Sequence, residues 1–130
     1  MKKILSIEDE HQLQNLLIKS FEREGYTFLQ AYDGERGLQV ARESHPDCIL
    51  LDLILPKRGG FSVLEELKKD EKTKNIPVII LTNLDKSEDV ERALRLGALM
   101  YLLKTDYDPT GIIQKVKKVL ETHGLKKVGI

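Results

Sequence analysis

Two kinds of hydrophobic pattern alternate along the chain. Short apolar runs rich in branched side chains predict five strands, and between them apolar residues recur at the three- and four-residue spacing of amphipathic helices. The last helical pattern is the most regular, because Ile112, Ile113, Val116, Val119 and Leu120 form one unbroken stripe. The strands are expected over residues 3–7, 27–31, 47–51, 76–81 and 99–103, with a helix after each.

Turn and capping residues stand where this alternation requires breaks. Gly25 and Gly97 follow predicted helices, Asp33 and Gly34 form a turn signal, and Pro109 occupies the permitted first position of the last helix. Strict alternation of strand and helix is typical of a parallel sheet covered on both faces, and the third and fourth runs are continuously apolar, as doubly buried strands are. The predicted fold class is therefore α/β, with a doubly wound, five-stranded parallel sheet and five helices.

Length and composition fit one ordinary domain. The chain has 130 residues, 41% of them hydrophobic, so one core is expected over residues 1–122, with residues 123–130 as a short tail. Lys plus Arg and Asp plus Glu each number 21, and this zero net charge gives no overall attraction to nucleic acid or to an anionic membrane. The single Cys48 lies in an apolar run, and no run approaches the roughly 18 residues of a membrane span. We therefore expect a cytoplasmic protein with a buried structural thiol.

Four of the five predicted strands end in residues that a strand interior would not contain. These residues are Glu8, Asp9 and Glu10 after the first strand, Asp52 after the third, Thr82 after the fourth and Lys104 after the fifth. In an open parallel sheet, ligands bind at the carboxyl ends of the strands, so these side chains are expected to converge on one edge. Each alone has a plain structural explanation, because acids and Thr cap helices and a strand-end lysine reaches solvent. Their joint placement predicts a functional site.

The residue types at these ends favour phosphoryl chemistry. Three carboxylates close together would repel one another unless a cation intervened, and hard oxygen ligands suit Mg²⁺ (or Mn²⁺), which readily binds a phosphoryl oxygen. Lys104 would attract another phosphoryl oxygen, and the Thr82 hydroxyl could donate to a third. The Asp52 carboxylate would then serve as the in-line nucleophile and form an acyl phosphate.

These motifs, in this order, resemble the response-regulator receiver family. They are the acidic pair after the first strand, the run from Asp52 to Pro56 with Gly60 eight residues past the Asp, the Leu81-Thr82 end, and the segment from Gly97 to Lys104. The resemblance covers residues 4 to about 120 and implies a flavodoxin-like sheet in the order 2-1-3-4-5. It also implies a stand-alone, phosphorylation-dependent switch of a two-component system or phosphorelay. Such a protein is not an enzyme on other substrates, since it catalyses only its own phosphorylation and dephosphorylation.

The same resemblance implies a role for individual positions. Asp52 would be the phosphoacceptor, Thr82 and Lys104 would hold the phosphoryl group, and Tyr101 would turn inward when Thr82 shifts. The metal ligands would be Glu8 (mainly through water), Asp9, Asp52 and the backbone carbonyl of Ile54. The donor would be a histidine kinase or a histidine phosphotransfer protein. The histidines of this chain, His11, His45 and His123, are scattered without ligand spacing and are assigned neither to metal binding nor to phosphotransfer. A downstream protein would recognise the face of the fourth helix, fifth strand and fifth helix, and whether phosphorylation also links two copies into a dimer is left open.

Several positions depart from the family pattern. Ile54 and Leu84, each two residues past a site residue, should flank the path of the attacking water, and both are apolar. We therefore expect slow self-dephosphorylation and a long-lived phosphorylated state. Asn83 stands where a small residue is usual, and it could either narrow access to Asp52 or contact the phosphoryl group. Thr105 replaces the common proline after the lysine, which leaves the isomer of that peptide bond open.

Other functions would fit parts of the same pattern. A non-phosphorylated pseudo-receiver adaptor would have the same fold, although the complete set of acids with Thr82 and Lys104 argues against it. An aspartyl-nucleophile phosphatase of the haloacid-dehalogenase type would need a second Asp where Ile54 stands. A flavodoxin-like cofactor binder would need a phosphate loop after the first strand, where acids would repel phosphate. The sequence has no separate helix-turn-helix segment, so DNA binding is not expected.

Overall fold

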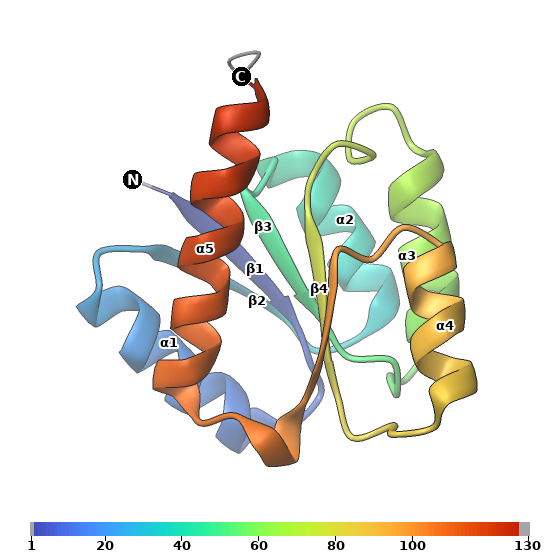
Figure 1. The fold of residues 1–130 in the computed structure, drawn as a ribbon, viewed down its shortest axis with the longest axis horizontal. Coiled ribbons are helices and arrows are strands. Elements are labelled where there is room, and N and C mark those ends of the chain that lie inside the picture. The colour runs from blue at the N-terminus through green and yellow to red at the C-terminus, as the bar shows by residue number, and fades with distance from the viewer. Residues whose placement is uncertain (1, 128–130) are drawn as a thin grey trace.

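The computed structural model describes residues 2–127 and contains one five-stranded sheet (Figure 1). The strands are β1 (Lys3–Ile7), β2 (Thr27–Ala31), β3 (Cys48–Leu51), β4 (Val78–Thr82) and β5 (Met100–Leu103). Their spatial order is β2-β1-β3-β4-β5, and every neighbouring pair runs parallel. The predicted fold class and sheet order are therefore confirmed.

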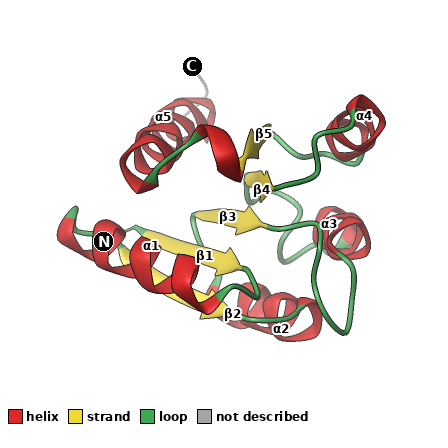
Figure 2. Ribbon diagram, turned by 90° about the horizontal axis from the view of Figure 1, so that it is seen from below, coloured by secondary structure: helices red, strands yellow, loops and turns green. Residues whose placement is uncertain are grey.

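Helices cover both faces of this sheet (Figure 2). They are α1 (His11–Arg23), α2 (Gly34–Ser44), α3 (Gly60–Lys69), α4 (Ser87–Arg95) and α5 (Pro109–Lys127), with a short 3₁₀ helix at Lys104–Asp106. Helices α1 and α5 lie on one face, and α2, α3 and α4 lie on the other. Parallel neighbours need long crossover connections, and here each crossover contains a helix, as the alternating hydrophobic pattern predicted.

Alternate residues of the central strands pack into two separate cores. In β3, Ile49 and Leu51 belong to the core under α2, α3 and α4, whereas Cys48 and Leu50 belong to the core under α1 and α5. All four side chains are buried, which explains why the strand is a continuous apolar run. Burial raises the pKa of the Cys48 thiol to about 12, so this cysteine is a packed, unreactive side chain.

Strand boundaries differ slightly from the sequence prediction. β4 begins at Val78 rather than at residue 76, because the N–H of Ile76 closes a turn onto the Thr73 carbonyl (3.0 Å) and Pro77 has no N–H to donate. The same strand extends one residue further than expected and includes Thr82. β3 and β5 each begin one residue later than predicted.

The helix ends lie where the turn and capping residues of the sequence predicted them. Gly25 and Gly97 have φ values of 91° and 109° just after α1 and α4, and Pro109 is the first residue of α5. Helix α5 continues to Lys127, into the segment expected as a tail, while residues 128–130 of that segment lie outside the described residues. Across the described chain, no helix has the length and apolar character to cross a membrane.

Candidate functional site

The sheet register brings the polar strand ends to one edge, towards which the arrowheads of β1 and β3 point in Figure 1. The last residues of β1 and β3 pair with each other, so Glu8 and Asp52 leave the sheet side by side. The last residues of β4 and β5 also pair, which puts Thr82 next to the segment that leads into Lys104. Residues that are far apart in the sequence therefore share one small region at the carboxyl ends of four strands.

The ammonium group of Lys104 is the centre of this cluster. Its Nζ lies 2.8 Å from Glu8 Oε1, 2.8 Å from Asp52 Oδ2 and 2.9 Å from Glu10 Oε1. An ammonium has three N–H donors, so each carboxylate receives one. The side chains of Lys104, Glu8 and Asp52 are only 10%, 3% and 4% exposed, so the two inner contacts are charge-assisted hydrogen bonds between largely buried groups. The peptide bond after the lysine is trans, as are all those of the described chain.

One cation does not balance the acids of the cluster. The pKa of Glu8 is raised from 4.5 to about 7, chiefly by burial and also by the Asp52 charge, while the hydrogen bond from Lys104 opposes the shift. Burial lowers the pKa of Lys104, but hydrogen bonds to Asp52, Glu8 and Glu10 outweigh it, so the net shift is upward and the ammonium stays charged. A second cation in the cleft would therefore be stabilised and would hold Glu8 in its ionised form.

The acids have the chemistry and spacing of a metal site. Carboxylate oxygens of Glu8, Asp9 and Asp52 all lie within 4.8 Å of one another, and Asp9 is exposed to solvent. Hard oxygen ligands with access to water fit Mg²⁺, which keeps part of its water shell. The carbonyl of Ile54 as a further ligand stays a prediction. The N–H of that residue donates to Asp52 Oδ1 at 3.2 Å and so holds the following loop against the carboxylate.

Thr82 and Tyr101 are connected through Leu84. Thr82 is fully buried, and its Oγ1 accepts a long hydrogen bond, 3.5 Å, from the Leu84 N–H. The Tyr101 hydroxyl donates to the Leu84 carbonyl at 2.8 Å, and its pKa is raised to about 12, chiefly by burial, so it stays protonated as a donor. A displacement of Thr82 would therefore reach Tyr101 through one shared backbone segment, while the switch role itself stays a prediction.

Loops from four strand ends line the cleft above Asp52. The lining residues are Asp9, Glu10, Asp52, Ile54, Asn83 and Lys104. Ile54 presents an apolar side chain that is 55% exposed, and Asn83 brings an amide to the same cleft. Leu84 is instead half-buried against the core under α2, α3 and α4. Of the two apolar residues expected beside the water path, the structure therefore puts Ile54 at the cleft and Leu84 behind it.

Glu10 is a site residue to which the sequence assigned no role of its own. It is 53% exposed, yet its carboxylate contacts the ammonium of Lys104. It is also the N-cap residue of α1, but its side chain makes no capping hydrogen bond. Thr82 likewise does not cap α4, since it belongs to β4 and the N-cap of α4 is Lys86. Side-chain capping of a helix therefore explains neither Glu10 nor Thr82.

Gly60 allows the loop after β3 to fold back beside the site. A Cβ at this position would collide with the Asp52 carbonyl oxygen and the Leu53 Cα. The Gly60 N–H donates to the Leu53 carbonyl at 3.0 Å, which closes the loop at the start of α3. The glycine eight residues past Asp52 is thus required by close backbone approach.

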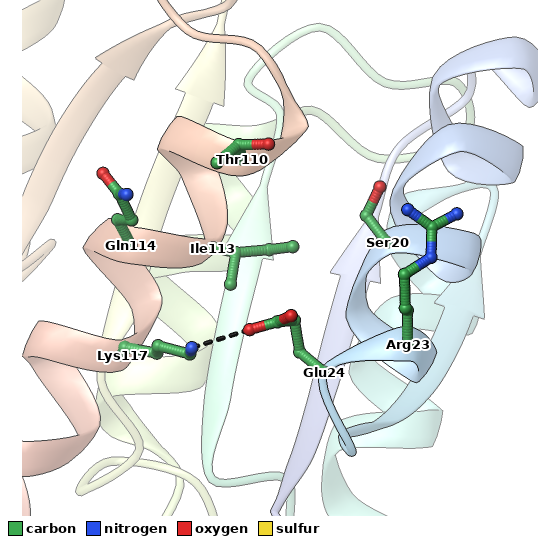
Figure 3. Close-up of a pocket in the computed structure, with 7 residues that line it drawn as sticks. All are labelled: Ser20, Arg23, Glu24, Thr110, Ile113, Gln114 and Lys117. Atoms are coloured by element: carbon green, nitrogen blue, oxygen red, sulfur yellow. Dashed lines mark hydrogen bonds and ion pairs between the residues drawn. The ribbon is translucent and has the colours of Figure 1, made fainter.

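A second cavity lies between α1 and α5 and does not share this chemistry (Figure 3). Its lining residues are Ser20, Arg23, Glu24, Thr110, Ile113, Gln114 and Lys117. The only acid among them, Glu24, already pairs with Lys117 at 2.7 Å. The last turn of α1 lines this cavity, whereas the acidic cluster precedes the first turn of that helix, so the two sites lie at opposite ends of α1. The strand-end cleft is therefore the candidate for phosphoryl chemistry.

A doubly wound sheet with clustered acids, a buried threonine and a paired lysine at its carboxyl edge defines the receiver class of signalling domain. The family model described as the response regulator receiver domain matches residues 4–126. The chain belongs to this family and is a receiver domain of two-component signalling.

Relatives of two different lengths match the chain. It is 38% identical to the DNA-binding dual master transcriptional regulator RpaA of Synechocystis over 92% of this chain, but it spans only 49% of that protein. It also spans about half of two other transcriptional regulators that match it. It is 34% identical to Protein PilH of Pseudomonas aeruginosa over 92% of this chain and 98% of that one. The crystal structure of a CheY-like receiver domain protein from Methanospirillum hungatei superposes with a TM-score of 0.90 at 25% identity, covering 97% of this chain and 98% of that chain.

Proposed function

We propose that the chain is a phosphorylation-dependent switch that accepts a phosphoryl group on Asp52, with Mg²⁺ (or Mn²⁺) held at the neighbouring acids. The observation that carries the proposal is the setting of Asp52, a carboxylate only 4% exposed between metal-fitting acids and a paired lysine. The phosphoryl group would come from a histidine kinase or a histidine phosphotransfer protein. Regulators among the relatives are consistent with such a pathway.

The proposed transfer forms one bond and breaks one. A carboxylate oxygen of Asp52 attacks the phosphorus of a phosphohistidine, the P–N bond breaks with its electron pair left on the imidazole nitrogen, and an acyl phosphate forms. Lys104 can exchange a carboxylate for a phosphoryl oxygen, and the Thr82 hydroxyl can donate to another oxygen. Bound Mg²⁺ would supply neutralisation of the phosphoryl charge.

The phosphorylated state is expected to be long-lived. Ile54 stands at the cleft beside Asp52 and has no group that can orient an attacking water molecule. Asn83 is the residue in this cleft that could contact the phosphoryl group or narrow the access of water. The chain would then catalyse only its own phosphorylation and slow dephosphorylation.

The output surface is proposed to be the face formed by α4, β5 and α5. Leu94 of α4 and Leu99 just before β5 have exposed apolar side chains, and Tyr101 on β5 reaches back to Leu84 beside the site. A downstream protein or a second phosphorylated copy would bind here. A stand-alone arrangement stays a prediction, because the chain spans nearly all of PilH but about half of RpaA. A cytoplasmic location and the absence of nucleic-acid binding by this domain also stay predictions.

The main alternative is an adaptor of the same fold that is never phosphorylated. It would not need three clustered carboxylates, one of which, Glu8, has its pKa raised chiefly by burial and also by the Asp52 charge, so the cluster argues for the switch. An aspartyl phosphatase is less well supported, since Ile54 and not a second acid follows two residues after Asp52.

Intact-mass spectrometry after incubation with acetyl phosphate tests the proposal. The wild-type chain is expected to gain one phosphoryl group with Mg²⁺ and none with EDTA. Asp52→Asn should gain none, and Asp85→Asn, which changes an exposed acid next to the site, should behave as wild type. Absence of any adduct, with acetyl phosphate and with a phosphorylated histidine kinase, would make the adaptor the better account.

A further inference from the structure

Gln14 is a polar residue on the buried side of α1 that the phosphoryl chemistry does not use. It shares the inner face of the helix with Leu17 and Phe21, and its exposed fraction is 0%. An apolar side chain is the usual choice at such a position. An amide in this place therefore needs a specific explanation.

The Gln14 amide joins α1 to the ends of two strands. Its Nε2 donates to the carbonyl oxygens of Ser6 at 3.0 Å, Glu8 at 3.2 Å and Ala31 at 3.2 Å. An amide nitrogen has two hydrogens, so three acceptors must share them. The Ala31 carbonyl also accepts from the Glu8 N–H at 2.9 Å. One side chain thus fixes the backbone where β1 ends and the acidic loop begins.

The buried Gln14 amide carries a free-energy cost that an apolar side chain at this position would avoid. The Gln14 Oε1 is buried and has no hydrogen-bond partner among the described residues. A buried acceptor without a partner costs about 1–3 kcal/mol. A methionine of nearly the same shape would remove that cost, but it would leave the Glu8 carbonyl without this donor. The hydrogen bonds from Gln14 Nε2 to the backbone carbonyls of the β1 and β2 ends therefore explain why glutamine stands here.

We propose that Gln14 is a positioning residue for the acidic loop, whose amide fixes the backbone from which Glu8 and Asp9 reach a bound metal ion. The inference rests on the proposed function only for its metal readout. Partners outside the first shell of a metal site typically change metal affinity by about 10- to 100-fold when they are removed. Gln14 acts here through the backbone, so we expect the lower end of that range.

The test compares Gln14→Met with Thr73→Val. Thr73 is a matched control, because it is 1% exposed and its hydroxyl donates to the Leu67 carbonyl at 2.7 Å, in the turn after α3. Calorimetric titration with Mg²⁺ should show an affinity about tenfold lower for Gln14→Met and within about twofold of wild type for Thr73→Val. Gln14→Asn, which keeps the amide on a shorter side chain, serves if the methionine variant does not fold, and it should also bind Mg²⁺ more weakly. Wild-type affinity in a folded Gln14 variant would overturn the proposal.

Backbone amide exchange without metal separates this proposal from the switch function. In a folded Gln14 variant, exchange at Glu8 and Glu10 should be at least about tenfold faster than in wild type, while Thr73→Val should leave both amides unchanged. Unchanged exchange at these amides in the Gln14 variant would overturn the positioning role. If the wild type bound no Mg²⁺, the switch function would fail, and amide exchange alone would decide the role of Gln14.

Discussion

Replacing Glu8 by Gln is expected to stabilise the metal-free protein at alkaline pH. Burial and the Asp52 charge raise the pKa of Glu8 from 4.5 to about 7, so the folded chain holds this proton more tightly than the unfolded chain does. Stability that depends on the bound proton is therefore complete below about pH 4.5 and is lost as the pH rises towards 7. A neutral glutamine does not ionise and avoids this loss.

The size of the effect follows from the pKa shift. A rise from 4.5 to about 7 corresponds to roughly 3 kcal/mol, at 1.36 kcal/mol for each pH unit. The cluster opens to solvent at the cleft, and in the variant Lys104 keeps its pairs with Asp52 and Glu10. Screening by solvent reduces the expected gain to about 1–2 kcal/mol.

Urea unfolding in EDTA at pH 5 and pH 8 measures this gain. Glu8→Gln should match wild type within about 0.5 kcal/mol at pH 5 and exceed it by about 1–2 kcal/mol at pH 8. Glu22→Gln, which changes an exposed acid in the last turn of α1, should show no such difference. A Glu8→Gln variant less stable than wild type at pH 8 would refute the reasoning that the cluster carries unbalanced negative charge.

Three further changes have clear expected outcomes. Lys104→Met leaves the buried carboxylates of Glu8 and Asp52 without their cation. Because Glu8 can take up a proton and so limit the repulsion, we expect the free energy of unfolding in urea without metal to fall by only about 2 kcal/mol, and an unchanged urea midpoint would contradict the pairing. Gly60→Ala should lower the free energy of unfolding by at least about 2 kcal/mol, because the new Cβ would collide with backbone atoms of Asp52 and Leu53. Gly59→Ala, where a Cβ meets open space, should change it by less than about 0.5 kcal/mol, and equal effects of the two variants would contradict the close approach at Gly60. Ile54→Asn should shorten the lifetime of the phosphorylated chain by roughly 5- to 10-fold, measured by phosphate release, and a wild-type half-life of seconds would contradict the slow hydrolysis.

Much of the fold could be predicted, because the hydrophobic pattern within each short segment shows whether it forms a strand or a helix. Doubly buried strands such as β3 are continuous apolar runs, and helices show their own period, so order and number of elements follow from pattern. The start of β4 could not be predicted, because Ile76 is apolar and only the turn onto Thr73 shows that it lies outside the sheet. The continuation of α5 to Lys127 could not be predicted either, since residues after 122 carry a weak apolar pattern.

Some features of the site could likewise be predicted from the sequence, and others could not. Asp52, Thr82 and Lys104 could be identified because polar residues directly after apolar strands mark the carboxyl edge of a parallel sheet. The contact of Glu10 with Lys104 could not, because it joins residues 94 positions apart and depends on side-chain conformation. The position of Leu84 behind the cleft is likewise a result of packing and not of sequence spacing.

The most direct test of the central claim is to locate the acyl phosphate chemically. The chain is phosphorylated with Mg²⁺ and acetyl phosphate and then treated with borohydride, which reduces an aspartyl phosphate to homoserine and leaves an ordinary carboxylate unchanged. Peptide mass spectrometry is expected to find homoserine at position 52 and at no other aspartate, and only in samples that contained both Mg²⁺ and the donor. Homoserine at another aspartate, or at none although the intact chain carries a phosphoryl group, would contradict the assignment of Asp52 as the phosphoacceptor.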